Sequence, residues 1–178
     1  MPSLVGPTKT PHQFGFKLGD SHLVINDQSE TLTAFDFNGK KLFTIPCLAR
    51  GQGYDDEWQS PKTDTPPGLY KVGSVWRDYE RLGETPKSVP ADLMPYGWFT
   101  LDLEELEAQE RRYGRAGICL HGGGSVLGRR GCWAPYQPLV TTHGCPRVHN
   151  AHLRDKIVPL LATGTVFVSV YQERPQPA

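Results

Sequence analysis

Short apolar runs separated by turn-forming residues dominate this chain and predict a fold built mainly from β-strands. The clearest turn is Asn38-Gly39, because this dipeptide between two β-rich runs is typical of a two-residue hairpin. Residues 51–67 are polar and rich in glycine and proline, and we expect them to form a long surface loop. The expected strands are His22–Asn26, Thr31–Phe37, Lys41–Ile45, Leu69–Trp76, Ala116–Leu120 and Thr165–Tyr171.

Two stretches carry helical patterns. Residues 102–112 have their glutamates early and two arginines late, which suits the dipole of a helix. In residues 150–162, Asn150 stands where an N-cap is expected, and Pro159 should kink or end the helix early because proline has no N–H to donate. The apolar face of this second helix would consist of Leu153, Ile157, Leu160 and Leu161.

Length and composition narrow the fold class. A chain of 178 residues suits one domain with a real core, and 19 glycines and 16 prolines favour short strands and loops over a helix bundle. We therefore expect a mainly β fold with one or two helices. The domain is expected over residues 21–172, after a loose proline-containing lead-in (1–20) and before a short tail (173–178).

Charge and hydropathy exclude several classes of partner. The 19 lysines and arginines balance the 19 aspartates and glutamates, so the net charge gives no reason to expect binding to nucleic acid or to an anionic membrane surface. From the net charge and composition we also expect a monomer. No apolar run approaches the roughly 20 residues that span a bilayer, so no membrane insertion is expected. Residues 1–7 lack the basic start and apolar block of a secretory signal. The chain is therefore expected to be cytosolic as written, to have lost an export signal, or to leave by another route.

A thiol and two imidazoles mark the candidate chemistry. Cys145 follows Gly144 in the run Thr142-His143-Gly144-Cys145-Pro146-Arg147, and His121 precedes Gly122 at a position 24 residues before the thiol. A free cysteine has a pKa of about 8.5, so a nearby imidazole is needed to supply thiolate at neutral pH. We expect Cys145 to be the nucleophile and His121 its base, with glycines freeing backbone N–H groups to hold an oxyanion. This chemistry needs no cofactor and no metal.

These landmarks resemble the L,D-transpeptidase catalytic domain (YkuD-like) family. The resemblance rests on the His-Gly pair, on the Thr-His-Gly-Cys-x-Arg run with Asn150 after it, and on Thr65-Pro66-Pro67-Gly68-Leu69-Tyr70 upstream. It runs from about His22 to Tyr171 and implies a β-sandwich or barrel of mixed strands, with a helix after the cysteine loop. Two features depart from the family pattern: the 20-residue spacing between His121 and Thr142, and Pro146 in place of an aliphatic residue.

The resemblance implies a specific reaction. Family members attack the bond between meso-diaminopimelate and D-alanine in a peptidoglycan tetrapeptide stem, release D-alanine and leave the stem as a thioester on the cysteine. An amine then accepts the acyl group, giving a 3→3 crosslink or a D-amino-acid exchange, and carbapenems acylate the same cysteine. The expected partners are therefore peptidoglycan stem peptides, at the cell wall or in the periplasm.

Other side chains near the motif are given provisional roles. His143 is expected in a supporting or oxyanion role, and Thr142 is expected to orient an imidazole. Arg147 would either hold a stem carboxylate bidentately or brace the loop. Gly122 would let the substrate approach the backbone, and Trp133 is the best candidate to touch glycan or stem peptide. Pro146 cannot donate a hydrogen bond, so the oxyanion donors would be Gly144, Cys145 or His143.

Several alternatives stay open. Water as acceptor would make the domain an L,D-carboxypeptidase that trims stems, and it could serve as a secreted antibacterial effector or a phage enzyme. An inactive wall-binding module is a non-enzymatic alternative. A zinc site built from His121, His143, Cys145 and Cys132 is disfavoured by spacing. A papain-like protease is disfavoured because there the cysteine precedes the histidine. The remaining cysteines (Cys47, Cys119 and Cys132) are expected to pack, although Cys132 could pair with another thiol.

Overall fold

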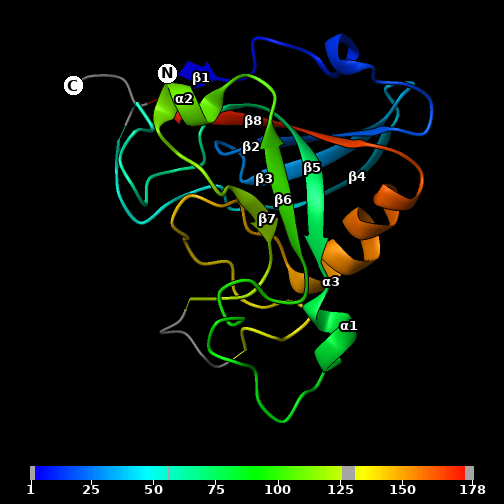
Figure 1. The fold of residues 1–178 in the computed structure, drawn as a ribbon, viewed down its shortest axis with the longest axis vertical. Coiled ribbons are helices and arrows are strands. Elements are labelled where there is room, and N and C mark those ends of the chain that lie inside the picture. Colours follow the sequence, from blue (N-terminus) through cyan, green and yellow to red (C-terminus); the bar gives the residue numbers. More distant parts are fainter. Residues whose placement is uncertain (1–2, 56, 126–130, 175–178) are drawn as a thin grey trace.

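One curled sheet of eight strands organises the chain in a computed structural model, which describes residues 3–55, 57–125 and 131–174 (Figure 1). The path through the sheet is β4-β3-β2-β8-β5-β6-β7, and β1 pairs with β8 off this path. The strands are β1 (Ser3–Val5), β2 (Ser21–Asn26), β3 (Thr31–Asp36), β4 (Lys41–Pro46), β5 (Gly68–Trp76), β6 (Thr100–Glu105), β7 (Cys119–His121) and β8 (Val166–Arg174).

β8 forms the centre of the sheet. Its first five residues are all buried, as expected for a strand covered on both faces. It runs parallel to β2, with Ser21 opposite Val166, and antiparallel to β5 on its other side. The mixed sheet and its last strand are therefore as the sequence predicts, although β8 continues to Arg174, beyond the expected end of the domain.

The predicted hairpin is confirmed. β3 and β4 pair antiparallel around Asn38-Gly39, and Gly39 has a φ of +79°, in the left-handed region that glycine adopts without steric cost. The Asp36 carboxylate accepts the N–H groups of Asn38 and Lys40, each at 2.9 Å, which closes the turn.

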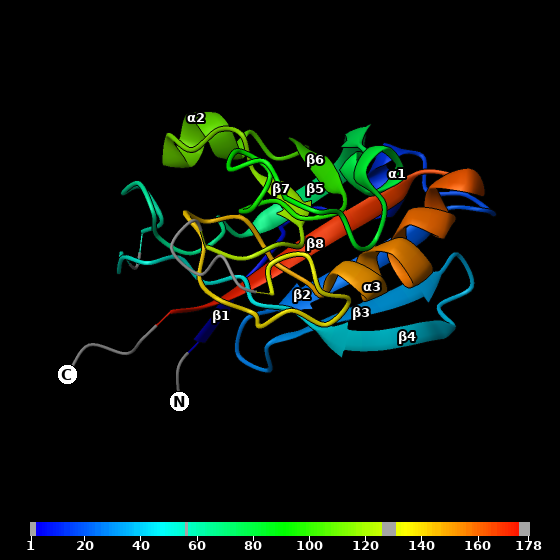
Figure 2. The ribbon, with the colours of Figure 1, turned by 90° about the horizontal axis from the view of Figure 1, so that it is seen from below.

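The first residues also take part in the fold. β1 pairs antiparallel with β8, with Val5 opposite Gln172, and a 3-10 helix follows at Pro11–Phe14. The described part of the expected lead-in thus adds a strand to the sheet, and both ends of the described chain lie near β1 (Figure 2). The expected tail lies outside the described residues from residue 175 onward.

The helix predicted over residues 102–112 is wrong. Residues 100–105 form β6, and a helix, α2, covers only Gln109–Tyr113. Leu101 and Leu103 are buried while Asp102 and Glu104 between and beyond them are more exposed, a period-two pattern that fits a strand between β5 and β7. Asp102 and Glu104 lie on the outer face of this strand, whereas Arg111 and Arg112 belong to α2. Ala108, at a φ of +56°, separates strand from helix.

The helix predicted at residues 150–162 forms as three short pieces. α3 (Asn150–His152) is followed by a wide π-type turn (Leu153–Ile157) and a 3-10 segment (Val158–Ala162). The change to 3-10 geometry comes one residue before Pro159, which confirms the predicted interruption. Figure 2 shows this segment inside the curl of the sheet, where Leu153 and Ile157 are completely buried.

A short helix and a long loop connect the remaining strands. α1 (Asp78–Leu82) follows β5. The loop at residues 51–67 is only partly a surface loop, since Trp58 is 1% exposed and its ring packs edge-on against Tyr113, with 6.0 Å between centroids. No helix within the described ranges is long and apolar enough to cross a membrane.

The strand assignment of β6 predicts a large loss of stability on Leu101→Ala. Leu101 is 0% exposed, so the substitution should leave a cavity and lower the free energy of unfolding by about 2–5 kcal/mol in urea denaturation. The matched control is Leu42→Ala on β4, where the side chain is 41% exposed and the expected change is within about 0.5 kcal/mol. Equal losses at the two positions would contradict the burial pattern.

Candidate active site

The site forms where the cysteine loop runs beside β7. His121 and Arg147 pair in a parallel bridge, with His121 N–H donating to Pro146 O at 3.2 Å and Val148 N–H donating to His121 O at 3.0 Å. These bonds bring His121 and Cys145 together although 24 positions separate them. Both residues line one cavity of about 440 Å³, together with Tyr96, Thr142, His143 and Arg147.

The His121 ring is held in one orientation. Its Nδ1 lies 2.8 Å from Gly122 O, and because a carbonyl can only accept, Nδ1 carries the proton. Nε2 is then the acceptor of the neutral ring. The edge of the Tyr96 ring packs against the imidazole, with 5.2 Å between centroids, and His121 is 3% exposed. A general base needs this combination of a fixed tautomer and a free ring nitrogen.

The environment of Cys145 favours thiolate. The Cys119 side chain first, and the His121 imidazole second, lower the pKa of Cys145 well below its usual value, against the opposing effect of burial. The Cys119 backbone N–H also donates to Cys145 Sγ at 3.4 Å. Cys145 is partly exposed at the cavity wall, so the sulfur is both activated and reachable.

Thr142 shapes the cysteine loop. Its hydroxyl donates to Cys145 O at 2.7 Å and accepts the Gly144 N–H at 2.9 Å. The hydroxyl therefore bonds the loop backbone at two points, and its expected role in orienting an imidazole stays a prediction. Because the Gly144 N–H is already bonded, it is also removed from the expected oxyanion donors, which leaves the N–H groups of His143 and Cys145.

Gly144 is required by a neighbour that the sequence does not reveal. Its φ is +117°, and a Cβ at this position would collide with the guanidinium of Arg115. Arg115 is 8% exposed and donates to Thr63 Oγ1 at 2.6 Å and to His143 O at 3.1 Å, so it ties the cysteine loop to the 51–67 loop. No motif signals this role, because Arg115 lies 28 residues before His143.

Arg147 is a brace. It is 2% exposed, and burial lowers the pKa of its guanidinium to about 10. It donates to Val140 O at 2.6 Å, Pro95 O at 3.1 Å, Gly122 O at 3.2 Å and Gly124 O at 3.5 Å. With its donors committed to backbone carbonyls, the structure favours loop bracing over the alternative of binding a stem carboxylate.

Asn150 is not a helix cap. His149 occupies the N-cap position, and the Asn150 side chain is fully buried. Its Oδ1 accepts the N–H groups of Gly123 at 3.0 Å and Trp98 at 3.4 Å. Its Nδ2 donates to Cys132 O at 3.0 Å and Ala134 O at 2.9 Å. Asn150 thus joins the loop after β7 to the loop before the cysteine motif.

Two expected substrate contacts are also corrected. A Cβ on Gly122 would collide with Asn150 Oδ1, so this glycine makes room for Asn150, and the residue itself is buried. Trp133 is 6% exposed and donates its indole N–H to Gly83 O at 2.9 Å, so it belongs to the core and not to the cavity wall. Tyr96, which sequence reasoning missed, is the aromatic residue beside His121.

The four residues considered as zinc ligands do not converge on one point. Among residues 3–55, 57–125 and 131–174, no group of three or more histidine, cysteine, aspartate or glutamate side chains could hold a metal ion. Cys132 is 4% exposed in the core, whereas His143 is exposed on the cysteine loop.

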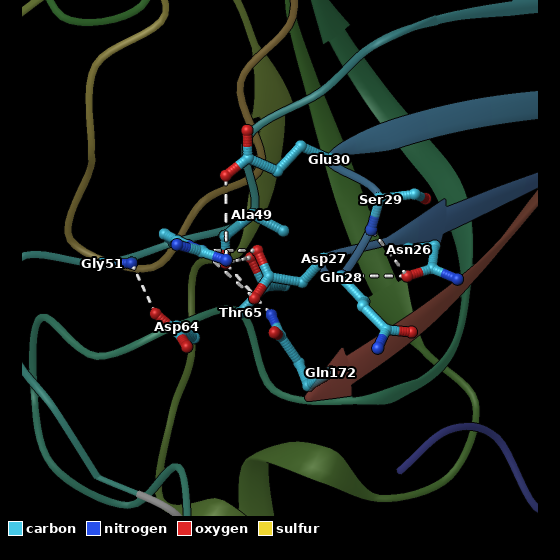
Figure 3. A network of polar contacts seen from close by, with 11 residues as sticks. Asn26, Asp27, Gln28, Ser29, Glu30, Ala49, Gly51, Asp64, Thr65 and Gln172 are labelled. Carbon is cyan, nitrogen blue, oxygen red and sulfur yellow. Dashed lines mark hydrogen bonds and ion pairs between the residues drawn. The ribbon is translucent and has the colours of Figure 1, made fainter. Parts of the chain in front are cut away.

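A polar network supports the cysteine loop from below (Figure 3). Arg50 Nε donates to Asp27 Oδ1 at 3.2 Å, and the Gln172 side-chain amide and the Thr65 backbone N–H both donate to Ala49 O, each at 3.0 Å. This network reaches the site at two points. The Thr65 hydroxyl lies 2.6 Å from Gly144 O, and the backbone carbonyl of Arg50 accepts the Thr142 N–H at 3.2 Å.

The sequence matches the profile of the L,D-transpeptidase catalytic domain (YkuD) family over residues 20–168. Since this match covers most of the chain, the protein belongs to the L,D-transpeptidase catalytic domain family. Enzymes of this family are cysteine-dependent peptidoglycan transpeptidases. A comparison with curated protein sequences gives no match.

Solved structures share the fold. Bd1075 from Bdellovibrio bacteriovorus gives a TM-score of 0.59 at 18% identity, with 99% of this chain and 56% of that chain covered. The helical cell shape determining protein Pgp2 from Campylobacter jejuni gives a TM-score of 0.54 at 19% identity, with 88% and 48% covered. This chain therefore spans about half the length of these two proteins, and the predicted mainly β class is confirmed.

The role of Asn150 predicts that Asn150→Asp is severe. An N-cap tolerates this change, because asparagine and aspartate cap helices about equally well. A buried side chain that bridges two loops does not tolerate it, because the aspartate carboxylate cannot replace the Asn150 Nδ2 donor to Cys132 O and Ala134 O. We expect the free energy of unfolding to fall by about 3 kcal/mol. The control is Asn38→Asp in the exposed hairpin turn, which should change it by less than about 0.5 kcal/mol. A near-neutral Asn150→Asp would contradict the bridging role.

The Asp27 network predicts a pH-dependent contribution to stability. Burial raises the pKa of Asp27 from 3.8 to about 6, against the effect of Arg50. The folded state therefore binds a proton on the Asp27 carboxyl more tightly than the unfolded chain does. The stability that this protonation contributes is fully present below about pH 4 and is lost as the pH rises towards 6. The unfolding free energy of wild type relative to Asp27→Asn should fall across this window and stay level above it, as measured by urea denaturation.

Asp55 provides a control of opposite sign. The backbone N–H groups of Glu57 and Ser60 donate to its carboxylate and lower its pKa. Its contribution to stability is present above pH 3.8 and is lost as the pH falls. For each variant, the difference in unfolding free energy from wild type is plotted against pH. Plots with slopes of the same sign for Asp27→Asn and Asp55→Asn would refute the conclusion that burial raises the pKa of Asp27.

Proposed function

We propose that this domain is a peptidoglycan L,D-transpeptidase whose nucleophile is Cys145 and whose base is His121. The observation that carries the proposal is that His121 and Cys145 line the same cavity, where the His121 imidazole helps to lower the pKa of the Cys145 thiol. The family supplies the substrate class: peptidoglycan, acted on at the cell wall. The substrate stem would carry meso-diaminopimelate followed by D-alanine.

The first half-reaction follows from the geometry of the two side chains. His121 Nε2 accepts the thiol proton, and Cys145 Sγ attacks the carbonyl carbon between diaminopimelate and D-alanine. The N–H groups of His143 and Cys145 are the donors left to hold the oxyanion, since Gly144 N–H is bonded to Thr142. As the C–N bond breaks, His121 returns the proton to the leaving amine. D-Alanine departs and a thioester remains on Cys145.

The second half-reaction requires an acceptor. His121, now neutral again, takes a proton from an incoming amine as its nitrogen attacks the thioester carbonyl. The products are the new amide and a free thiol. Water in the same position would give a tripeptide, so the identity of the acceptor separates transpeptidase from L,D-carboxypeptidase activity.

Cys145→Ala is expected to abolish D-alanine release from tetrapeptide stems, because Cys145 is the one cysteine among the described residues that line the cavity. Mass spectrometry of stem peptides incubated with the protein shows whether D-alanine is lost, exchanged or replaced by a crosslink. His121→Gln should slow release by about 10²–10⁴, because it removes general base catalysis.

The matched control is Cys47→Ala, at a buried core thiol outside the cavity, which should retain turnover. Incubation with a carbapenem adds an independent readout, since a covalent adduct should appear on wild type and not on Cys145→Ala. A folded wild-type protein that leaves stem tetrapeptides intact and forms no adduct would overturn the proposed function.

A further inference from the structure

The second thiol at the active site is Cys119. Of the four cysteines, Cys47 and Cys132 are buried, while Cys119 and Cys145 are partly exposed. The Cys119 backbone N–H donates to Cys145 Sγ at 3.4 Å, and the Cys119 side chain lowers the pKa of Cys145. Both sulfurs also lie close to Gly117 O, at 3.6 Å for Cys119 and 3.8 Å for Cys145.

The backbone contacts place the two cysteines side by side. The parallel bridge between His121 and Arg147 holds the cysteine loop beside β7, whose first residue is Cys119. Side chains two residues apart in a strand point to the same face, so Cys119 lies on the His121 side of β7. The 3.4 Å contact from the Cys119 N–H to Cys145 Sγ brings that sulfur against residue 119, which is the proximity that a disulfide requires.

We propose that Cys119 is a resolving thiol, which forms a reversible disulfide with Cys145 when Cys145 is oxidised by a peroxide. The pairing itself requires only the two thiols. Its consequence, the reversible loss of turnover, rests on the proposed function of Cys145.

The chemistry balances in two steps. The Cys145 thiolate attacks hydrogen peroxide, the O–O bond breaks, and a sulfenic acid and hydroxide form. The Cys119 sulfur then attacks the Cys145 sulfur, an S–S bond replaces the S–O bond, and water leaves with the proton of the Cys119 thiol. Two thiols are oxidised and one peroxide is reduced.

The local electrostatics favour this order. The hydrogen bond to Cys145, together with burial and the Cys145 charge, raises the pKa of Cys119. Cys145 is therefore the first thiolate and the first to be oxidised. Sulfenic acid formation removes the Cys145 negative charge, so Cys119 becomes easier to deprotonate at the moment when it is needed. His121 Nε2 is the nearby acceptor for its proton.

Both sulfurs can be reached by a small oxidant. Cys145 lines the 440 Å³ cavity, and Cys119 lines a second hollow of about 410 Å³ with Trp76 and Thr100. Tyr96 lines both. Cys132, the pairing partner considered from the sequence, is 4% exposed and packs in the core, so Cys119 replaces it as the candidate.

The test treats the full chain with hydrogen peroxide, blocks remaining thiols with an alkylating agent and maps peptides by mass spectrometry. Wild type should yield a peptide pair joined through Cys119 and Cys145, with the loss of two hydrogen atoms, and dithiothreitol should release it. In Cys119→Ser and Cys119→Ala, Cys145 should instead advance to the sulfinic acid, which dithiothreitol does not reverse. Cys132→Ser should behave as wild type.

Two results would overturn the proposal: a disulfide that joins Cys145 to Cys132, or sulfinic acid formation at Cys145 that is equally fast with and without Cys119. Turnover of stem peptides is measured separately, before oxidation and after reduction. A disulfide that forms in a protein with no turnover in its reduced state would refute the proposed function and leave the resolving role of Cys119 intact.

Discussion

The buried guanidinium of Arg147 is the constraint on which the site depends. Burying an ion costs several kcal/mol unless hydrogen bonds replace its water. Here four backbone carbonyls do so, from residues 95, 122, 124 and 140. Since these carbonyls belong to three separate segments, any movement of one segment would leave part of the charge unpaired. The arginine in the cysteine motif therefore fixes the position of the loops around Cys145.

The other polar side chains of the site act in the same way. Asn150 and Arg115 also bond backbone groups that lie far away in the sequence, and each demands a glycine beside it, Gly122 for Asn150 and Gly144 for Arg115. The glycines of the motif are thus explained by the volume of buried neighbours. Substrate approach to the backbone is not needed to account for them. These side chains therefore hold the loops in place, and His121 and Cys145 are the residues lining the cavity to which we assign the proposed chemistry.

The sequence predicts the structural features that depend on neighbouring residues. The hairpin at Asn38-Gly39, the central strand and the interruption at Pro159 follow from neighbouring residues, and the structure has all three. β6 was predicted as a helix because its outward charges resemble a helix dipole, and only pairing with β5 and β7 reveals the strand. The roles of Arg147, Gly122 and Trp133 depend on partners up to 52 residues away, so the motif names these residues without revealing what they contact.

The strand that carries His121 also places residue 119 beside Cys145. In β7, Leu120 points into the core, while residues 119 and 121 face the cysteine loop. The backbone N–H of residue 119 donates to Cys145 Sγ at 3.4 Å, so this residue adjoins the thiol. Burial alone would raise the pKa of the Cys145 thiol, and the groups that oppose this effect are the Cys119 side chain first and His121 second. A side chain without a donor at position 119 would leave only His121 and the residue 119 backbone N–H to lower this pKa, so residue 119 helps to set the reactivity of the sulfur.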